Sequence, residues 1–197
     1  MRLITIIVCL LLVYSACDEQ AIAKPRPRQY PRIDFPETSM ITVSEPSCPF
    51  TMELPEYAKV VMRPSQEDDR PVHPCWFDLD IDQLGAVIHC SYYPIDHRNT
   101  LDDLREDAFT MASKHNVKAS FRDEIAIETS QGSKGIIFKI EGPVATPYQF
   151  FISDDKKHFL RGSLYFKNRV ELDSVAPVID FLREDINEIV GSVKWLN

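Results

Sequence analysis

The sequence predicts an α+β domain built from a mostly antiparallel β-sheet with helices packed on its faces. Residues 48–92 alternate apolar and polar side chains repeatedly, which is the period of a β-strand. Four more strand-like segments lie between 121 and 167. Two segments, one in the middle and one at the end of the chain, keep apolar residues at helical spacing. Each helical stripe needs a sheet face to cover it, so helices on the two faces of one sheet is the simplest arrangement.

The first strands precede the middle helix. Alternation over 50–54 predicts a strand that ends at Pro55, and 57–62 predicts a second strand that folds back on the first. A polar, proline-bounded loop follows at 64–74. Residues 75–81 and 86–92 alternate around a turn that contains Gly85, which predicts a β-hairpin.

Both helices carry start signals. Thr100 and Asp103 form a capping box ahead of the middle helix. The last helix is expected to be capped by Asp173 or Ser174, with Pro177 in its first turn and an end at Lys194-Trp195. The strands expected between the two helices cover about 121–129, 135–141, 147–153 and 158–167. This order of elements is similar to the α/β/α sandwich of the PsbP family of photosystem II extrinsic proteins, and the similarity rests on element order only.

Composition is that of a folded protein that does not bind nucleic acid. The chain has 197 residues, of which 44% are hydrophobic and 26% charged, so its length requires only one domain. The net charge is −8. A nucleic-acid-binding domain needs a basic face to displace counterions from phosphate, and an acidic chain argues against one.

The N-terminus predicts export and lipidation. Met1-Arg2 is followed by an apolar run from Leu3 to Val13, which is too short to span a bilayer. Tyr14-Ser15-Ala16-Cys17 resembles a lipobox, which predicts a signal peptide over 1–16 and acyl chains on Cys17. These chains would anchor the protein to a membrane. The alternative is ordinary cleavage after Ala21-Ile22-Ala23, which would release a soluble protein.

Residues 17–46 are expected to form the lipidated N-terminus and a proline-rich tether, followed by one globular domain over 47–197. The tether is interpreted either as a solvated linker or as a basic arm that lies on anionic lipid or an acidic partner. Tyr30, Ile33 and Phe35 are more apolar than a linker requires, so part of the segment is expected to dock. Its basic residues are Lys24, Arg26, Arg28 and Arg32.

Three cysteines lie in the globular part. If the strands at 50–54 and 57–62 fold back on each other, Cys48 and the returning Cys75 reach the same end, which favours a disulfide between them. Cys90 lies in mid-strand on the apolar side, where a buried thiol is expected.

The sequence contains no motif for catalysis, a metal or a cofactor. Asp78, Asp80 and Asp82 match only the start of a calcium loop, so outward carboxylates on a strand are the preferred interpretation. The five histidines show no metal-ligand spacing, and neither a nucleophile motif nor a phosphate-binding loop is present. We therefore expect a protein that is not an enzyme.

The segment HFLRGSLYF, residues 158–166, is the candidate interface. Strand parity places Phe159, Arg161 and Tyr165 on one face, and an arginine between aromatic residues is typical of a binding hot spot. The alternative is that the terminal helix covers this face and Arg161 pairs with a carboxylate. Gly162 indicates that another group approaches the strand closely there.

Several motifs together resemble the gliding-motility lipoprotein GldD family of the Bacteroidota, over essentially the whole mature chain. They are PRPRQYPRIDFPE (25–37), CPF (48–50), PEYAKV (55–60), CWFDL (75–79), HFLRGSLYF and the final helix. The resemblance implies a lipid-anchored envelope protein that is required for gliding and for type IX protein secretion, with no established catalytic activity. Residue by residue, it assigns lipidation to Cys17 and matches Cys48 and Cys75 to the family's two strand-start cysteines.

These observations lead to one preferred function and two alternatives. The preferred function is a non-enzymatic factor that binds and stabilises a gliding or secretion component, on the periplasmic side of the outer membrane or else at the inner membrane. Arg26, Arg28, Tyr30, Arg32, Phe159, Arg161 and Tyr165 are its candidate interface. The first alternative is a periplasmic module that holds a cell-wall or lipid fragment between sheet and helix. The second alternative is a hydrolase, which would need a polar cleft with a nucleophile and a base within reach.

Overall fold

The computed structural model describes residues 32–63, 73–115, 117–167 and 172–196. The expected signal peptide, Cys17, Arg26, Arg28 and Tyr30 lie outside these residues. The helices are η1 (Asp82–Leu84), α2 (Leu101–Ser113) and α3 (Leu172–Ser192). The strands are β1 (Met40–Ser44), β2 (Phe50–Pro55), β3 (Lys59–Met62), β4 (Trp76–Ile81), β5 (Ala86–Pro94), β6 (Phe121–Glu128), β7 (Lys134–Glu141), β8 (Tyr148–Ser153), β9 (His158–Phe166) and β10 (Lys194–Trp195).

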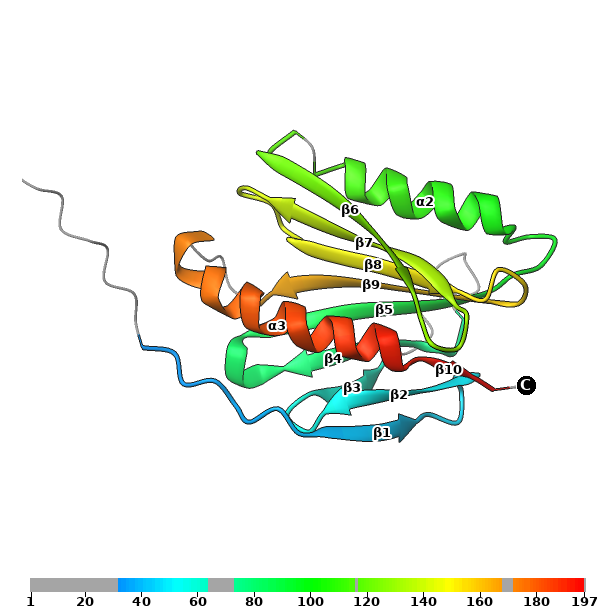
Figure 1. The fold of residues 1–197 in the computed structure, drawn as a ribbon, viewed down its shortest axis with the longest axis horizontal. Helices are drawn as coiled ribbons and strands as arrows, with labels where there is room; N and C mark the ends of the chain where they lie inside the picture. The colour runs from blue at the N-terminus through cyan, green and yellow to red at the C-terminus, as the bar shows by residue number, and fades with distance from the viewer. Residues whose placement is uncertain (1–31, 64–72, 116, 168–171, 197) are drawn as a thin grey trace, which may run out of the picture. The chain divides into compact units, whose positions relative to one another are not determined.

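Seven of these strands form one antiparallel sheet in the order β3-β4-β5-β9-β8-β7-β6, as Figure 1 shows. Helix α3 covers one face of this sheet and α2 the other, and each helix has its own cluster of buried apolar side chains. The predicted α+β class is therefore confirmed. The predicted hairpin around Gly85 is also confirmed, because β4 pairs with β5 along its whole length.

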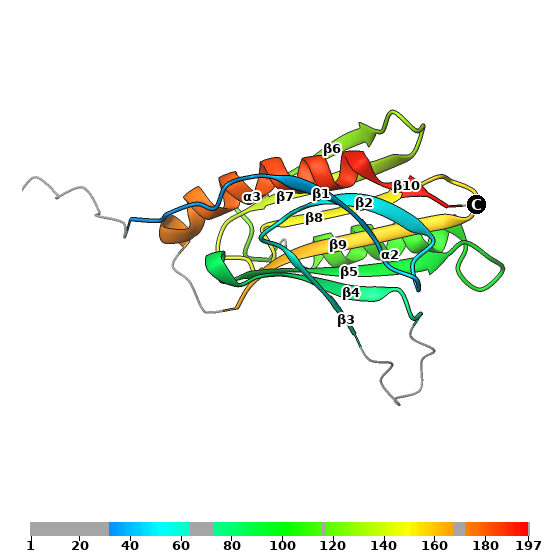
Figure 2. The ribbon, with the colours of Figure 1, turned by 90° about the horizontal axis from the view of Figure 1, so that it is seen from below.

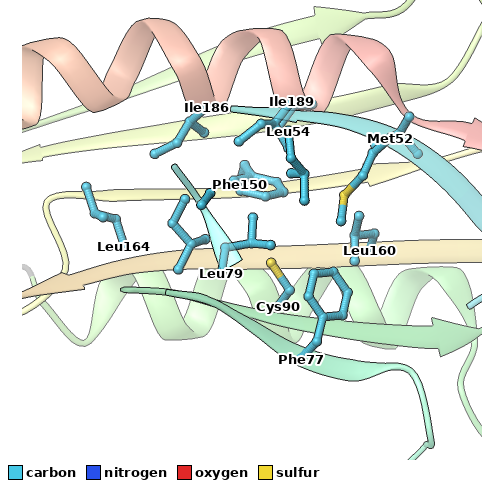
Figure 3. Packing of buried hydrophobic residues seen from close by; sticks show 14 of the residues in the cluster. Met52, Leu54, Phe77, Leu79, Cys90, Phe150, Leu160, Leu164, Ile186 and Ile189 are labelled. Atoms are coloured by element: carbon cyan, nitrogen blue, oxygen red, sulfur yellow. The ribbon is translucent and has the colours of Figure 1, made fainter. Parts of the chain in front are cut away.

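The larger core lies between the sheet and α3. Ile186 and Ile189 of α3 meet Leu79, Leu160 and Leu164 of the sheet, and all five side chains are nearly fully buried (Figure 3). Burial of each such side chain stabilises the fold by about 1.5–3 kcal/mol. The face of β9 that carries Leu160 and Leu164 is therefore part of the core and is not exposed to a partner.

A second, three-stranded sheet was not predicted. It has the order β1-β2-β10, and β2 adds Met52 and Leu54 to the core beside α3 (Figures 2 and 3). The expected hairpin between 50–54 and 57–62 is wrong, because β2 pairs with β1 and β10 whereas β3 pairs with β4. The chain changes sheets at Pro55, so the two strands bury their apolar sides without pairing with each other.

Two boundaries also differ from the prediction. Residues 40–44, which were expected to belong to a tether that runs to residue 46, form β1. Pairing with β2 satisfies the main-chain groups on one side of this strand. At the other end, α3 begins at Leu172, before the expected cap at Asp173 or Ser174, and stops at Ser192. Lys194–Trp195 then leaves the helix to pair with β2, which the helical interpretation of this segment missed.

The segment just before β1 docks on the domain, as its apolar residues predicted. Ile33 packs against the larger core, and the Phe35 ring stacks on Phe181 of α3 at 4.7 Å between centroids. Tyr57 also lies against Phe181 and donates a hydrogen bond from its hydroxyl to the buried carboxylate of Asp185. No helix of the described residues is long and apolar enough to cross a membrane.

Candidate interaction face

Strand β9 lies at the centre of the large sheet, between β5 and β8, and its two faces have different surroundings. Leu160 and Leu164 point toward α3, as strand parity predicted. Phe159 points toward α2 and is only 1% exposed, stacked on Phe151 at 5.1 Å. Phe159 is therefore a core residue, and its assignment to the interface is wrong, because α2 covers this end of the strand.

Gly162 has the close neighbour that the sequence indicated. The ring of Phe150, on the adjacent strand β8, lies across it, and a Cβ added at Gly162 would overlap two ring carbons. A glycine is needed here because the two strands are paired at this position and the ring fills the side-chain space. Arg161, the preceding residue, therefore lies on a strand that is closely packed against its neighbour β8.

Beyond α2, side chains from three strands form a continuous surface that we term the open face. Helix α2 packs over β7, β8 and the start of β9, which leaves the same side of β4, β5 and the rest of β9 without a helix (Figure 1). Most side chains that point to this side are half-buried rather than buried. The open face consists of Trp76, Asp78, His89, Tyr93, Arg161 and Tyr165.

One end of the open face is aromatic. The Trp76 and Tyr93 rings meet edge to face at 5.5 Å, and the Trp76 indole N–H donates a hydrogen bond to the carbonyl of Tyr92 at 3.1 Å. The Arg161 guanidinium lies 5.9 Å from the centre of the Tyr93 ring. This is a cation–π arrangement rather than the carboxylate pair considered as an alternative.

The other end is charged. Asp78 accepts a hydrogen bond from Arg63 Nε at 2.6 Å and shares a 2.7 Å contact with Nδ1 of His89. The His89 ring lies 5.0 Å from that of Tyr165. These contacts link three strands through side chains, so the polar groups of the face are already held in place before any partner arrives.

Asp78 and Asp80 lie on β4 on the side away from the larger core, as predicted, whereas Asp82 belongs to η1 and not to the strand. Lys167 forms ion pairs with both Asp80 and Asp82, and the hydrogen bonds from this ammonium hold the pKa of Asp82 below its usual range. Within the described ranges, no three His, Cys, Asp or Glu side chains gather as metal ligands would. The arrangement is thus one of ion pairs on a sheet surface.

The disulfide between Cys48 and Cys75 is present, with 4.9 Å between the two Cα atoms. It joins the segment before β2 in the small sheet to the segment before β4 in the large sheet. The Cys90 thiol is free and buried among apolar side chains, and this burial raises its pKa. Both observations agree with the sequence interpretation.

Of the remaining candidate residues, Arg32 is the one that the structure describes, and it is not part of the open face. Arg32 is exposed and pairs with its neighbour Asp34 at 3.0 Å. The sequence interpretation missed Trp76, Tyr93 and His89. Their signal was present in the predicted hairpin, because the residues that alternate with its apolar positions share one face.

The chain is thus a disulfide-bonded α+β domain with an aromatic and charged sheet surface. The family model described as "Gliding motility lipoprotein GldD" matches residues 20–195, and the chain belongs to this family. It is therefore a lipid-anchored protein of the cell envelope with a role in gliding motility.

Solved structures give a further likeness. The chain is similar in structure to cyanobacterial PsbP (CyanoP) from Synechocystis sp. PCC 6803, with a TM-score of 0.42 and 12% sequence identity. That comparison covers 76% of this chain and 92% of the other. No curated protein matches the sequence.

Proposed function

We propose that the protein is a non-enzymatic lipoprotein that binds and stabilises a component of the gliding and type IX secretion machinery through its open face. Acyl chains on Cys17 would hold the domain at the membrane, on the periplasmic side of the outer membrane. The residues between Cys17 and Arg32 would then set how far the open face reaches toward its partner.

The composition of the open face is the observation that carries this proposal. Trp76, Tyr93 and Arg161 belong to the residue types that contribute most to binding energy at interfaces. They are half-buried and fixed by contacts with one another, so binding would order few side chains and lose little conformational entropy. Core residues of these types would be fully buried, whereas these three side chains keep part of their surface exposed for contact with a partner.

Photo-crosslinking in intact cells tests the open face directly. A photoreactive residue at Arg161 should trap one envelope protein, which mass spectrometry would identify. The matched control places the same residue at Arg105, an arginine on α2 that is not one of the open-face residues and pairs with Asp155 at 2.9 Å. Equal trapping at both positions would contradict a partner on the open face.

The role of the open face in stabilising that partner needs a second measurement. The Trp76→Ala and Arg161→Ala variants should lower the cellular amount of the trapped protein, whereas Arg105→Ala should not. The amount of the variant protein itself must stay unchanged for this result to count. Normal partner levels with either open-face variant would refute the stabilising role.

The anchor is tested at Cys17. Metabolic labelling with a fatty acid should mark the protein, and Cys17→Ala should abolish the label and release the domain from the membrane fraction. Full gliding by cells that carry only the unlipidated form would refute the tethering part of the proposal. Recovery of a mature N-terminus at Lys24 would instead support the soluble alternative.

Ligand binding is a second candidate function. A surface hollow of about 660 Å³ lies where the end of α2, the end of β9 and α3 meet, lined by Lys114, Lys118, Tyr165 and Ile179 among others. Its lysines would suit an anionic fragment. A native mass spectrum of the purified protein with a bound small molecule would support this function, and Lys114→Gln with Lys118→Gln should remove that molecule.

A further inference from the structure

Strand β6 is one of the two edge strands of the large sheet and the most exposed strand in it. Among the described residues it pairs only with β7, and six of its eight residues are exposed to solvent. Phe121 and Ile125 keep 54% and 41% of their surface in water. A long edge strand with exposed apolar side chains is a template for pairing with another strand.

The free side of β6 can be assigned residue by residue. Thr129 donates its N–H to the carbonyl of Ser133, the residue opposite it across the hairpin, at 2.8 Å. Antiparallel pairing alternates, so odd-numbered residues of β6 bond to β7 and even-numbered ones turn their N–H and C=O groups outward. Consistent with this, the N–H of Glu124 donates to the side chain of Asp123 at 2.9 Å. Ala126 is the next residue with the same orientation.

A groove runs beside this edge. Figure 1 shows the β6–β7 hairpin curving toward the C-terminal half of α3, and a hollow of about 560 Å³ lies between them. Ile125 and Ile127 line its β6 side, and Ile137, Tyr148 and Val190 contribute further apolar surface. The groove could therefore receive apolar side chains from a strand added to β6.

Gly191 provides the opening on the helix side. It lies in α3, lines the groove, and a Cβ added there meets no atom within 4 Å. A larger side chain at this position would fill the groove, and a glycine in a helix is replaced without loss of helix propensity.

The edge carries excess negative charge. Three of the four charged residues of β6 are acidic, namely Asp123, Glu124 and Glu128, and of these Glu124 pairs with Arg122 of the same strand at 2.6 Å. The two basic residues of the groove are already paired, Lys139 with Glu141 at 2.9 Å and Arg183 with Asp180 at 3.3 Å. A basic strand would be attracted, whereas a second copy of this chain, with net charge −8, would bring more negative charge to the same edge.

We propose that β6 and its groove bind an extended segment of a partner protein, which adds to the large sheet as an eighth strand. The segment carries apolar residues at alternate positions, for the groove, together with lysine or arginine that faces the acidic edge. Its main chain bonds to the outward C=O of Glu124 and to the outward N–H and C=O of Ala126. This site is separate from the open face and does not depend on the function proposed for that face.

The probe is a fluorescent nine-residue peptide that alternates valine and lysine, titrated against the full chain in detergent. We expect saturable binding that weakens with added salt, and slower hydrogen exchange over residues 121–128. A peptide that alternates valine and glutamate should not bind. Equal binding of the two peptides, or no binding of either, would overturn the proposal.

Two substitutions locate the peptide. Ala126→Pro removes an outward N–H without removing a bond to β7, and should weaken binding about fivefold or more, the factor for one lost main-chain hydrogen bond. Its control is Ala126→Val, which keeps the N–H and suits a strand. Gly191→Phe should weaken binding about tenfold or more by filling the groove, and Gly191→Ala should not.

The outcomes separate the possible occupants. Peptide binding that survives both Ala126→Pro and Gly191→Phe lies elsewhere, and the proposal fails. Sedimentation that shows a dimer of the full chain, dissociated by Ala126→Pro, would assign the edge to a second copy instead of a basic partner. Circular dichroism must show unchanged folding for both variants. If Ala126→Pro does not fold, the comparison of Gly191→Phe with Gly191→Ala tests the proposal, and equal peptide binding by these two variants would overturn it.

Discussion

The packing of Phe150 over Gly162 leads to a quantitative prediction for Gly162→Ala. An alanine in a strand normally stabilises relative to glycine by about 0.5–1 kcal/mol. Here the new methyl group overlaps two ring carbons of Phe150, which is 3% exposed and lies in the larger core. Overpacking of a filled core costs about 1–3 kcal/mol, which exceeds the gain. We therefore expect a net loss of about 1–2 kcal/mol in the free energy of unfolding.

Urea unfolding of the oxidised protein measures this loss. Gly162→Ala should lower the midpoint without changing the slope, because the fold itself is unchanged. Gly191→Ala is the matched control and should raise the midpoint, since nothing lies within 4 Å of its new methyl group.

A double-mutant cycle identifies the cause. Phe150→Leu alone should destabilise the protein, yet Gly162→Ala should cost less in the Phe150→Leu background than in the native one. A Gly162→Ala variant as stable as the native protein would refute the reasoning. If the full loss persists in the Phe150→Leu background, its cause lies in the strand and not in the ring.

Three further predictions concern other parts of the fold. Reduction of the Cys48–Cys75 disulfide, which closes a separation of 27 residues, should lower the free energy of unfolding by about 3.5 kcal/mol in the chain-entropy model; urea midpoints with and without reductant measure it. Burial raises the pKa of Asp185, so the folded state binds this proton more tightly than the unfolded state does. Stability should therefore fall as pH rises from the ordinary carboxyl range through the raised pKa, and Asp185→Asn should remove that slope in unfolding curves recorded from about pH 4 to about pH 8. Trp195→Phe should cost about 1–2 kcal/mol in thermal or urea unfolding, because the buried Ser133 hydroxyl loses the indole N–H that lies 2.8 Å from it.

Local patterns predicted most elements of the fold. The hairpin around Gly85, the Thr100 cap of α2 and the two faces of β9 all depend on residues close in sequence, and the structure confirms each. The disulfide was also predicted correctly, although the hairpin used to argue for it does not form. The disulfide forms because the residues before β2 in the small sheet and before β4 in the large sheet lie close together.

The small sheet and the open face could not be predicted from patterns of residues that are close in the sequence. Strand β10 is two residues long, which is too short for any periodicity, and it forms because β2 offers an unpaired edge at the end of α3. The open face needs Tyr93 beside Arg161, and this neighbourhood arises only when β5 pairs with β9 across the intervening α2 and three strands. Phe159 was misassigned for the same reason, since the position of α2 over the sheet is a tertiary property.

The disulfide has a mechanical consequence for a domain that is held at its N-terminal end. Tension that arrives at Arg32 first loads the contacts of Ile33 and Phe35, and then β1, an edge strand that can peel from β2 one hydrogen bond at a time. Peeling that reaches Cys48 must stop there, because the covalent link passes the load straight to Cys75 and bypasses β2 and β3. Strand β2 and its contacts with α3 are thus shielded from tension applied at the N-terminal end of the domain.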